Sequence, residues 1–225
     1  MDDNMKIIAH IRSDFPTKFG IPRQSGLADF ESVIVFEPEY RKEEAFRGLE
    51  GFSHLWLLWK FSEAHRDSWS PTVRPPRLGG NKRIGVFATR SPFRPNPIGL
   101  SSVRLLGIEK THDGPVLRIT GADLMDGTPI YDIKPYLPYT DSHPDAVGGF
   151  ADERREYRLA VEFPEALLSR IPEKKRAPLI ELLANDPRPQ YIQDPDRVFG
   201  FEFAGFEIRF TVKDGTLTVK EVEKT

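Results

Sequence analysis

A proline-rich loop at residues 90–99 carries side chains that are suited to binding a ligand. It follows an apolar stretch that ends at Arg90, and it presents Arg94 and Asn96 among three prolines that fall within six residues. Proline fixes φ, removes a backbone donor and pushes the preceding residue toward an extended conformation, so the loop is stiff before any ligand arrives. A stiff loop holds two guanidinium groups and an amide at fixed positions with little ordering entropy left to lose. The loop therefore predicts a binding site.

A second segment, residues 123–136, brings three titratable side chains into register. The pair Asp126-Gly127 predicts a tight turn, after which Asp132, Lys134 and Tyr136 alternate along an extended segment. Because successive side chains of a strand point to opposite faces, these three share one face. A carboxylate, an ammonium group and a phenol on one face form either a structural ion pair or an acid–base cluster, and the residues alone leave both interpretations open.

Two shorter motifs are further candidates. Residues 19–26 form a loop bounded by glycine and proline that presents Arg23 and Gln24, and it is either a connecting turn or a binding loop. His54 stands at the start of the most apolar predicted strand, where it is either a structural residue or part of a site. The five histidines show no metal-ligand spacing and the chain has no nucleophile motif, so we expect no metal and disfavour a hydrolase.

The composition of the 225-residue chain is that of an ordinary globular protein, with 39% hydrophobic and 29% charged residues. No apolar stretch approaches the roughly 20 residues that span a bilayer. The N-terminus lacks the basic leader and apolar stretch of an export signal, and the absence of cysteine excludes disulfides, thiolate metal sites and cysteine nucleophiles. We therefore expect a cytoplasmic protein without a membrane segment.

The net charge of −2 hides a segregation of charge along the chain. Residues 68–108 contain no Asp or Glu but seven Lys and Arg residues, a local charge of +7, whereas acidic residues crowd the N-terminal third and the segment after Asp123. Such a stretch can attract a polyanion whatever the charge of the whole protein. It is either a surface for a polyanion or a basic face that an acidic face balances within the fold.

Short apolar stretches separated by Gly, Pro and Asp clusters predict a mainly β protein. They cover residues 6–12, 32–36, 53–61, 83–89, 101–108 and 116–120. This spacing is typical of an antiparallel sheet or barrel. Residues 39–49 are the one early helix candidate. No Gly-x-Gly-x-x-Gly motif follows a strand, which disfavours a doubly wound nucleotide-binding fold.

A change of composition at residues 145–152 predicts a domain boundary, with an antiparallel β-barrel core domain at residues 1–146 and a small C-terminal α+β domain at residues 147–225. In the second part, residues 155–163 read as a strand. Residues 165–183 have helical apolar spacing, which we expect Pro172 and Pro178 to break into two short helices. Residues 197–222 alternate as strands do, and Asp214-Gly215 predicts the turn of their last hairpin.

Two long motifs resemble the TsaA-like (TrmO) family. They read Gly-Val-Phe-Ala-Thr-Arg-Ser-Pro-Phe-Arg-Pro-Asn-Pro-Ile-Gly-Leu at residues 85–100 and Asp-Leu-Met-Asp-Gly-Thr-Pro-Ile-Tyr-Asp-Ile-Lys-Pro-Tyr at residues 123–136. Residues 5–143 resemble the β-barrel core of the family, and Asp186-Pro187-Arg188-Pro189 with the strands after it is similar to the C-terminal domain of bacterial members. The resemblance implies a methyltransferase that uses S-adenosylmethionine to methylate N6 of threonylcarbamoyl-adenosine beside the anticodon of threonine tRNAs.

The resemblance also implies where the cofactor binds and that the protein is a homodimer. In this family the cofactor lies against the barrel, near the dimer interface. Carried over position by position, the cofactor site comprises Pro22, Arg23, Gln24, His54, Leu55, Arg90, Leu100, Asp123, Leu124, Met125 and Asp126. Carboxylates suit the ribose hydroxyls or the amino group of the cofactor, and an arginine suits its carboxylate.

For methyl transfer we expect in-line positioning of the acceptor nitrogen and removal of its proton. The hypothesis is that Asp126, Asp132 or Tyr136 accepts that proton or orients the nitrogen, with Lys134 balancing charge. For the anticodon stem–loop of the tRNA, the candidate phosphate contacts are Arg74, Arg77, Lys82, Arg83 and Arg94, and Trp69 or Phe93 could stack on unpaired bases. The alternatives are a non-catalytic RNA-binding β-barrel and a small-molecule methyltransferase on the same scaffold.

Overall fold

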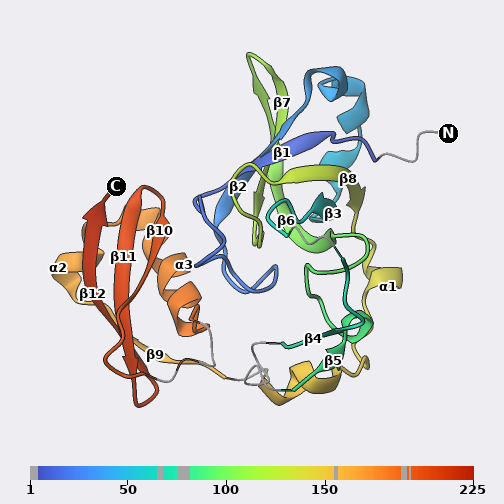
Figure 1. Ribbon diagram of the computed structural model, residues 1–225. Helices are drawn as coiled ribbons and strands as arrows, with labels where there is room; N and C mark the ends of the chain where they lie inside the picture. The colour runs from blue at the N-terminus through green and yellow to red at the C-terminus, as the bar shows by residue number, and fades with distance from the viewer. Residues whose placement is uncertain (1–4, 65–67, 76–81, 155–156, 189–191, 193) are drawn as a thin grey trace.

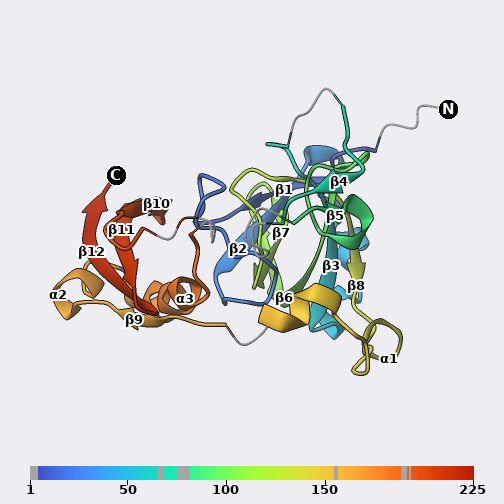
Figure 2. The same ribbon diagram turned by 60° about the horizontal axis from the view of Figure 1, so that its bottom comes forward.

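The computed structural model describes residues 5–64, 68–75, 82–154, 157–188, 192 and 194–225. Two sheets form separate lobes, one from the first two-thirds of the chain and one from its C-terminal third (Figures 1 and 2). The prediction of a mainly β protein with a large antiparallel sheet is confirmed. No helix among the described residues is long and apolar enough to cross a membrane.

The first sheet pairs six strands in the closed order β1-β2-β7-β6-β3-β8. Their bounds are β1 Ala9–Arg12, β2 Glu31–Phe36, β3 His54–Lys60, β6 Ile98–Thr111, β7 Gly114–Thr120 and β8 Pro129–Pro135. All six pairings are antiparallel. A separate two-stranded ribbon joins β4, Thr72–Val73, to β5, Ile84–Gly85.

The strand β3 shows why the apolar alternation of the sequence produces this sheet. Leu55, Leu57 and Trp59 are buried, whereas the residues between them are only partly buried. Every second side chain of the strand therefore points into the interior. The core of the first lobe consists of Ala9, Ile11, Ile34, Phe36, Phe46, Leu55, Leu57, Trp59, Val103, Leu117, Ile119, Ala122, Leu124 and Ile130.

Two local predictions for this lobe were wrong. Residues 39–49 contain no α-helix but fall in a run of 3-10 turns, η1 Pro38–Tyr40, η2 Glu43–Phe46 and η3 Leu49–Gly51. Only Phe46 is buried among these turns, so the segment lacks the apolar face whose packing stabilises a helix. Residues 83–89 are extended only at β5 and continue as the 3-10 turn η5, Val86–Ala88, because their partner strand β4 has just two residues.

The second lobe is a four-stranded sheet with two helices. Its order is β10-β11-β12-β9, with β9 parallel to β12 and the other pairs antiparallel. The bounds are β9 Ala160–Glu162, α2 Glu165–Leu168, α3 Glu173–Ala184, β10 Phe199–Phe203, β11 Phe206–Lys213 and β12 Thr216–Lys224. The short segments α1, Pro138–Asp141, and η6, Gly149–Arg154, connect the two lobes.

The hairpin turn at Asp214-Gly215 is confirmed, since both residues have positive φ and the flanking residues pair. Pro172 precedes α3 as predicted, but Pro178 does not break the helix. Leu179, Leu182 and Leu183 are buried in the core that the helix shares with the sheet. This packing offsets the hydrogen bond that Pro178 cannot make.

The loop between β1 and β2, residues 13–30, packs into the core of the second lobe. Phe15, Ala28 and Phe30 are buried in the same cluster as α3 and the strands β10 to β12. Phe15 and Phe30 each contact the ring of Phe203, with centroids 5.5 and 5.1 Å away. In both views this loop lies beside α3, between the lobes (Figures 1 and 2). The loop that connects two strands of the first sheet is thus a structural part of both lobes.

Candidate functional site

The carboxylate of Asp123 lies at the centre of a polar cluster just after the end of β7, beside β6. The hydroxyl of Ser101 donates a hydrogen bond to Oδ1 of Asp123 at 2.5 Å, and Nε1 of Trp59 donates to the same hydroxyl at 2.9 Å. Ser101 and Trp59 are buried, so their geometry is fixed by the core. The chain Trp59–Ser101–Asp123 therefore holds the carboxylate in one orientation.

The path of the chain explains this position. Thr120, the last residue of β7, pairs with Arg104 of β6, and the chain continues along β6 until Asp123 reaches Ser101. Gly121, at φ 81°, accepts a main-chain hydrogen bond from Gly26 at 2.9 Å. This hydrogen bond holds the loop 13–30 beside the end of β7.

The environment of Asp123 shifts its titration. Burial raises the pKa of Asp123 above the ordinary value, while the hydrogen bond from Ser101, the charge of Arg90 and the main-chain N–H of Ser25 lower it. Burial has the largest effect, because it penalises the charged form. A partly buried carboxyl group with a raised pKa, next to a guanidinium group, is typical of a functional site.

Arg90 and Gln24 complete this cluster. Nη1 of Arg90 donates to Oε1 of Gln24, and Arg90 also lies close enough to act on Asp123. The structure thus brings together three of the predicted cofactor residues, Gln24, Arg90 and Asp123, from distant parts of the chain. Ser25, Trp59 and Ser101 also belong to the cluster and were not predicted.

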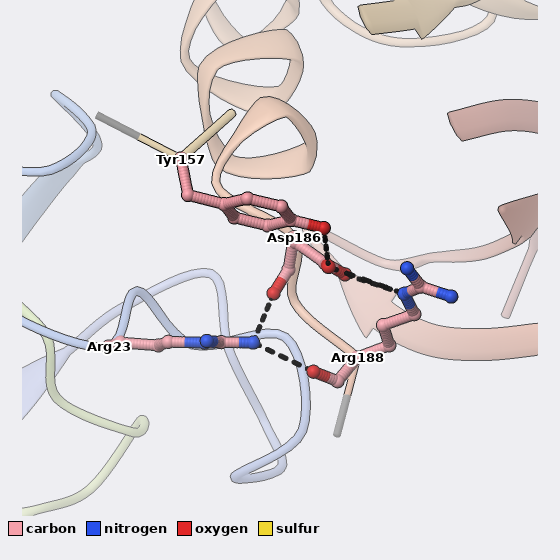
Figure 3. A network of polar contacts seen from close by, with 4 residues as sticks. All are labelled: Arg23, Tyr157, Asp186 and Arg188. Atoms are coloured by element: carbon pink, nitrogen blue, oxygen red, sulfur yellow. Dashed lines mark hydrogen bonds and ion pairs between the residues drawn. The ribbon is translucent and has the colours of Figure 1, made fainter. Parts of the chain in front are cut away.

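Arg23, the neighbour of Gln24, reaches the second lobe instead of the cluster (Figure 3). Its Nη2 donates to the main-chain oxygens of Asp186 and Arg188, the latter at 2.7 Å. The side chain of Asp186 is fully buried and accepts hydrogen bonds from Nε of Arg188 at 3.0 Å and from the hydroxyl of Tyr157 at 3.1 Å. The Asp-Pro-Arg segment is thereby fixed as a docking point for the loop that carries Gln24.

Three predicted cofactor residues are buried. Leu55 is 0% exposed and Leu124 1% exposed, both in the core of the first lobe, and Pro22 is buried in the loop. Their side chains are therefore not exposed to a ligand. Met125 is partly buried beside them.

His54 and Leu100 lie on the outer face of the first sheet. Leu100 is 56% exposed and pairs with Leu58 of β3, which also pairs with Asp132 of β8. Residues that face each other across neighbouring strands point to the same side, so Leu100 and Asp132 flank Leu58 on one face. His54 is exposed at the start of β3, with its ring centroid 6.2 Å from that of Tyr136.

The predicted alternation in β8 holds on this outer face. Nζ of Lys134 forms an ion pair with Oδ2 of Asp132 at 2.8 Å, and the ring of Tyr136 packs against Trp56 with centroids 5.5 Å apart. The ion pair raises the pKa of Lys134, through the hydrogen bond to Asp132 first and through its charge. Nε1 of Trp56 in turn donates to Asp141 at 2.7 Å.

Asp126 lies in a different place. Its Oδ1 accepts a hydrogen bond from the main-chain N–H of Ser13 at 2.9 Å, and its Oδ2 is 3.7 Å from the guanidinium of Arg12. No hydrogen bond, ion pair or ring contact between described residues joins Asp126 to Asp132 or Tyr136. Gly127, the residue after Asp126, lines a cavity of about 310 Å³ together with His10, Arg12, Val35, Phe36, Glu37 and Arg41.

The predicted phosphate contacts divide into exposed and engaged side chains. Arg74, Lys82 and Arg83 are exposed near the β4–β5 ribbon, where Nη1 of Arg83 also donates to the hydroxyl of Thr72 at 3.1 Å. Arg94 is partly buried, and its Nη1 donates to the main-chain oxygens of Val86 at 3.1 Å and Thr89 at 2.6 Å. The remaining candidate, Arg77, lies outside the described residues.

The sequence offered a weak signal for Ser101. Ser101 pairs with Leu57, so it occupies a core-facing position of the alternating strand β6. A buried hydroxyl needs a hydrogen-bond partner, which makes a polar residue at such a position a site candidate. No sequence pattern indicates the hydrogen bond from Arg23 to the main-chain oxygen of Asp186, because the two residues are 163 positions apart.

Solved structures share this fold over its full length. A crystal structure of TrmO from Pseudomonas aeruginosa superposes with a TM-score of 0.79 and 37% sequence identity, covering 100% of this chain and 98% of that chain. Another crystal structure of TrmO gives a TM-score of 0.78 at 36% identity. The chain thus shares the fold of the TrmO proteins, a class built around an antiparallel β-sheet.

Family models identify the member of this class. The model of the tRNA-methyltransferase O N-terminal domain matches residues 10–142, and the model of the TrmO C-terminal domain matches residues 156–225. The chain therefore belongs to the tRNA-methyltransferase O family.

Curated relatives agree with this assignment. The tRNA (adenine(37)-N6)-methyltransferase of Escherichia coli is 43% identical over 227 residues, 96% of both chains. A putative S-adenosylmethionine-dependent methyltransferase of Pseudomonas aeruginosa is 43% identical over 93% of both chains. A probable S-adenosyl-L-methionine-binding protein of Methanothermobacter thermautotrophicus is 39% identical over 142 residues, which are 63% of this chain and 96% of the relative.

Proposed function

We propose that this protein is an enzyme that transfers a methyl group from S-adenosylmethionine to N6 of adenosine 37 in tRNA. The observation that carries the proposal is the full-length similarity to a relative named for this reaction, at 43% identity over 96% of both chains. The two solved structures of TrmO that share the fold support the same activity.

The polar cluster around Asp123 fits S-adenosylmethionine by its chemistry. A carboxylate such as Asp123, already fixed by Ser101, suits the ribose hydroxyls or the amino group of the cofactor. The exposed guanidinium of Arg90 suits its carboxylate, and the exposed side chain of Leu100 offers apolar surface for the adenine. The bound cofactor supplies a methyl group on an activated sulfonium.

The finer proposal for the substrate is threonylcarbamoyl-adenosine beside the anticodon of threonine tRNAs. Its acceptor nitrogen shares its lone pair with both the ring and the carbonyl of the ureido group. Removing the proton from this nitrogen therefore increases its nucleophilicity, and a general base within hydrogen-bond reach would help.

The surroundings of the three candidate bases favour Asp132 and Tyr136 over Asp126. Asp132 and Leu100 flank Leu58 on the outer face, and Asp132 is oriented by Lys134. One carboxylate oxygen of Asp126 instead accepts from the main-chain N–H of Ser13, and the other faces the guanidinium of Arg12. These contacts suit a role in holding the loop 13–30. We propose that Asp132 or Tyr136 receives the proton or orients the nitrogen.

Replacing each group by its nearest isostere tests these roles. Asp132→Asn and Tyr136→Phe should lower the turnover number while S-adenosylmethionine binding, measured by calorimetry, stays at the wild-type level. Asp126→Asn serves as the comparison, and we expect it to affect stability more than turnover. Full activity in both Asp132→Asn and Tyr136→Phe would contradict the assignment.

We further propose that the two domains have different roles. Residues 1–146 carry the methyltransferase site, and residues 147–225 are an accessory α+β domain that contributes to tRNA binding. In line with the expected family properties, the protein acts in the cytoplasm as a homodimer. The basic stretch with Arg74, Arg77, Lys82, Arg83 and Arg94 supplies phosphate contacts, which match the phosphate backbone of tRNA.

A methyl-transfer assay tests the activity. With S-adenosylmethionine labelled in its methyl group, we expect label in tRNA that carries threonylcarbamoyl-adenosine at position 37 and none in the same tRNA with guanosine at that position. Label in neither RNA, but in a small-molecule fraction, would support the alternative of a small-molecule methyltransferase. Binding of RNA without any transfer would support a non-catalytic RNA-binding protein.

A further inference from the structure

Two large aromatic side chains lie exposed and stacked near the β4–β5 ribbon. Trp69 is 52% and Phe87 73% exposed, and their rings are 6.2 Å apart with an angle of 28° between the planes. Burial of such rings is a large source of stability, so an exposed, adjacent pair indicates a surface that a partner covers. Neither ring belongs to the polar cluster around Asp123 or to the outer face with Asp132.

Hydrogen bonds within its turn fix the position of Phe87. Phe87 is the middle residue of the 3-10 turn η5, whose first residue, Val86, is only 1% exposed and anchors the turn. Thr89 closes the turn through its main-chain N–H and its hydroxyl, which both donate to the oxygen of Val86. Nη1 of Arg94 donates to the oxygens of Val86 and Thr89. Phe87 is therefore presented on a preorganised support.

The chain beside Trp69 is fixed to the same support. The hydroxyl of Ser70, the next residue, donates to the main-chain oxygen of Thr72 at 2.8 Å. The main-chain N–H of Val86 donates to the oxygen of Pro71 at 2.9 Å. The two rings thus come from segments that are bonded to each other, which keeps their spacing constant.

Positive charge surrounds the two rings. The guanidinium carbon of Arg94 lies 5.9 Å from the centroid of Phe87, and Arg74, Lys82 and Arg83 are exposed on the neighbouring segments. Residues 68–108 include no Asp or Glu. A partner of this surface therefore combines flat π-faces with negative charge, as unpaired nucleotides do.

We propose that Trp69 and Phe87 form a stacking platform for unpaired bases of RNA, those of the tRNA anticodon loop; this inference rests on the proposed function. Aromatic side chains beside basic ones bind single-stranded nucleic acid by stacking on the bases and pairing with the phosphates. A second copy of this chain fits less well, because a two-fold contact would bring this basic surface against itself. Stacking here would position the loop next to the methyltransferase site.

The binding of a tRNA anticodon stem–loop to full-length variants tests this platform. We expect Trp69→Ala and Phe87→Ala each to raise the dissociation constant by about 5- to 150-fold, the range typical of one stacked base. Trp69→Phe and Phe87→Tyr should retain most of the affinity. The matched control is Tyr139→Ala, which removes another highly exposed aromatic ring, 82% accessible, from α1 outside the ribbon. Unchanged S-adenosylmethionine binding in each variant shows that the fold is intact.

Two further comparisons separate stacking from charge. The slope of the dissociation constant against salt should stay at the wild-type value in the two alanine variants and decrease in Arg74→Ala and Arg83→Ala. A stem–loop with abasic loop positions should bind the wild type and the alanine variants equally.

The outcomes that overturn the platform are distinct from failure of the proposed function. Wild-type affinity for the intact loop in both alanine variants would overturn the platform and leave the proposed function standing. Loss of self-association, with RNA affinity unchanged, would assign the surface to a second copy of the chain. A wild-type protein that binds no RNA would contradict the proposed function, and the platform with it.

Discussion

The guanidinium of Arg23, in the loop 13–30, donates a hydrogen bond to the main-chain oxygen of Arg188, in the segment after α3, at 2.7 Å (Figure 3). The same nitrogen also donates to the oxygen of Asp186, whose buried carboxylate fixes the Asp-Pro-Arg segment. The next residue, Gln24, accepts a hydrogen bond from Arg90 beside Asp123. The second lobe therefore anchors the loop that completes the polar cluster of the first.

Replacing Arg23 with alanine should weaken both the fold and the cluster. Hydrogen bonds to a charged group contribute about 1.5–3 kcal/mol, so we expect Arg23→Ala to lower the free energy of unfolding by about this amount. The loss of the anchor should also weaken S-adenosylmethionine binding, measured by calorimetry. Arg47→Ala is the control, because Arg47 is exposed and forms no side-chain hydrogen bond with the described residues. Equal effects of the two substitutions would contradict the anchoring role.

Gly20 offers a direct test of the packing between the loop and the second lobe. A Cβ atom at Gly20 would lie 2.3 Å from Cδ2 of Phe201, whereas a Cβ atom at Gly26 would meet nothing within 4 Å. Both glycines have positive φ, at 94° and 77°, so alanine introduces similar backbone strain at each. We expect Gly20→Ala to cost about 1–3 kcal/mol more than Gly26→Ala in chemical denaturation, because of overpacking. Equal losses would show that the loop does not pack against Phe201.

The titration of Asp123 predicts a pH-dependent difference in stability. Because burial raises the pKa of Asp123 in the folded state above its ordinary value of 3.8, the protonated form is favoured by folding. Its contribution to stability is fully present below the ordinary value and is lost as the pH rises through the folded-state pKa. Asp123→Asn cannot ionise, so its stability relative to the wild type should increase over that same interval of rising pH. Denaturation at a series of pH values measures this difference, and a constant difference would contradict the raised pKa.

Trp59 positions Asp123 through Ser101, so a change at Trp59 should reach the site without touching a ligand. Trp59→Phe keeps a smaller aromatic ring in the core and removes the N–H that donates to Ser101. The loss of the hydrogen bond that the Ser101 hydroxyl accepts should lower the free energy of unfolding by about 1 kcal/mol and allow Ser101 to turn away from Asp123. We expect weaker S-adenosylmethionine binding, measured by calorimetry. Wild-type binding with reduced stability would limit Trp59 to a structural role.

The features of the fold that could be predicted from the sequence are those set by local patterns. The alternation of Leu55, Leu57 and Trp59 predicts a half-buried strand, and Asp214-Gly215 predicts a hairpin turn, because each needs only neighbouring residues. The strand predicted at residues 83–89 was too long because a strand also needs a partner. The two residues of β4 give it pairing only at Ile84–Gly85.

The candidate site was predictable in its charged residues and less so in their connections. Arg90, Gln24 and Asp123 were predicted and meet in one cluster, whereas Asp126, predicted both for the cofactor site and as a candidate proton acceptor, lies against Ser13. The supporting contacts of Ser101 and Asp186 join residues distant along the chain, which only the closed strand order and the packing of the two lobes bring together.

The measurement that tests the central claim most directly is nucleoside mass spectrometry of tRNA after incubation with labelled S-adenosylmethionine. Threonine tRNA that carries threonylcarbamoyl-adenosine is compared with the same tRNA without this modification. The proposed function predicts one labelled methyl group on the modified nucleoside at position 37 and none on the unmodified tRNA. Labelled methyl groups on another nucleoside, or none on either tRNA while the cofactor binds, would contradict it.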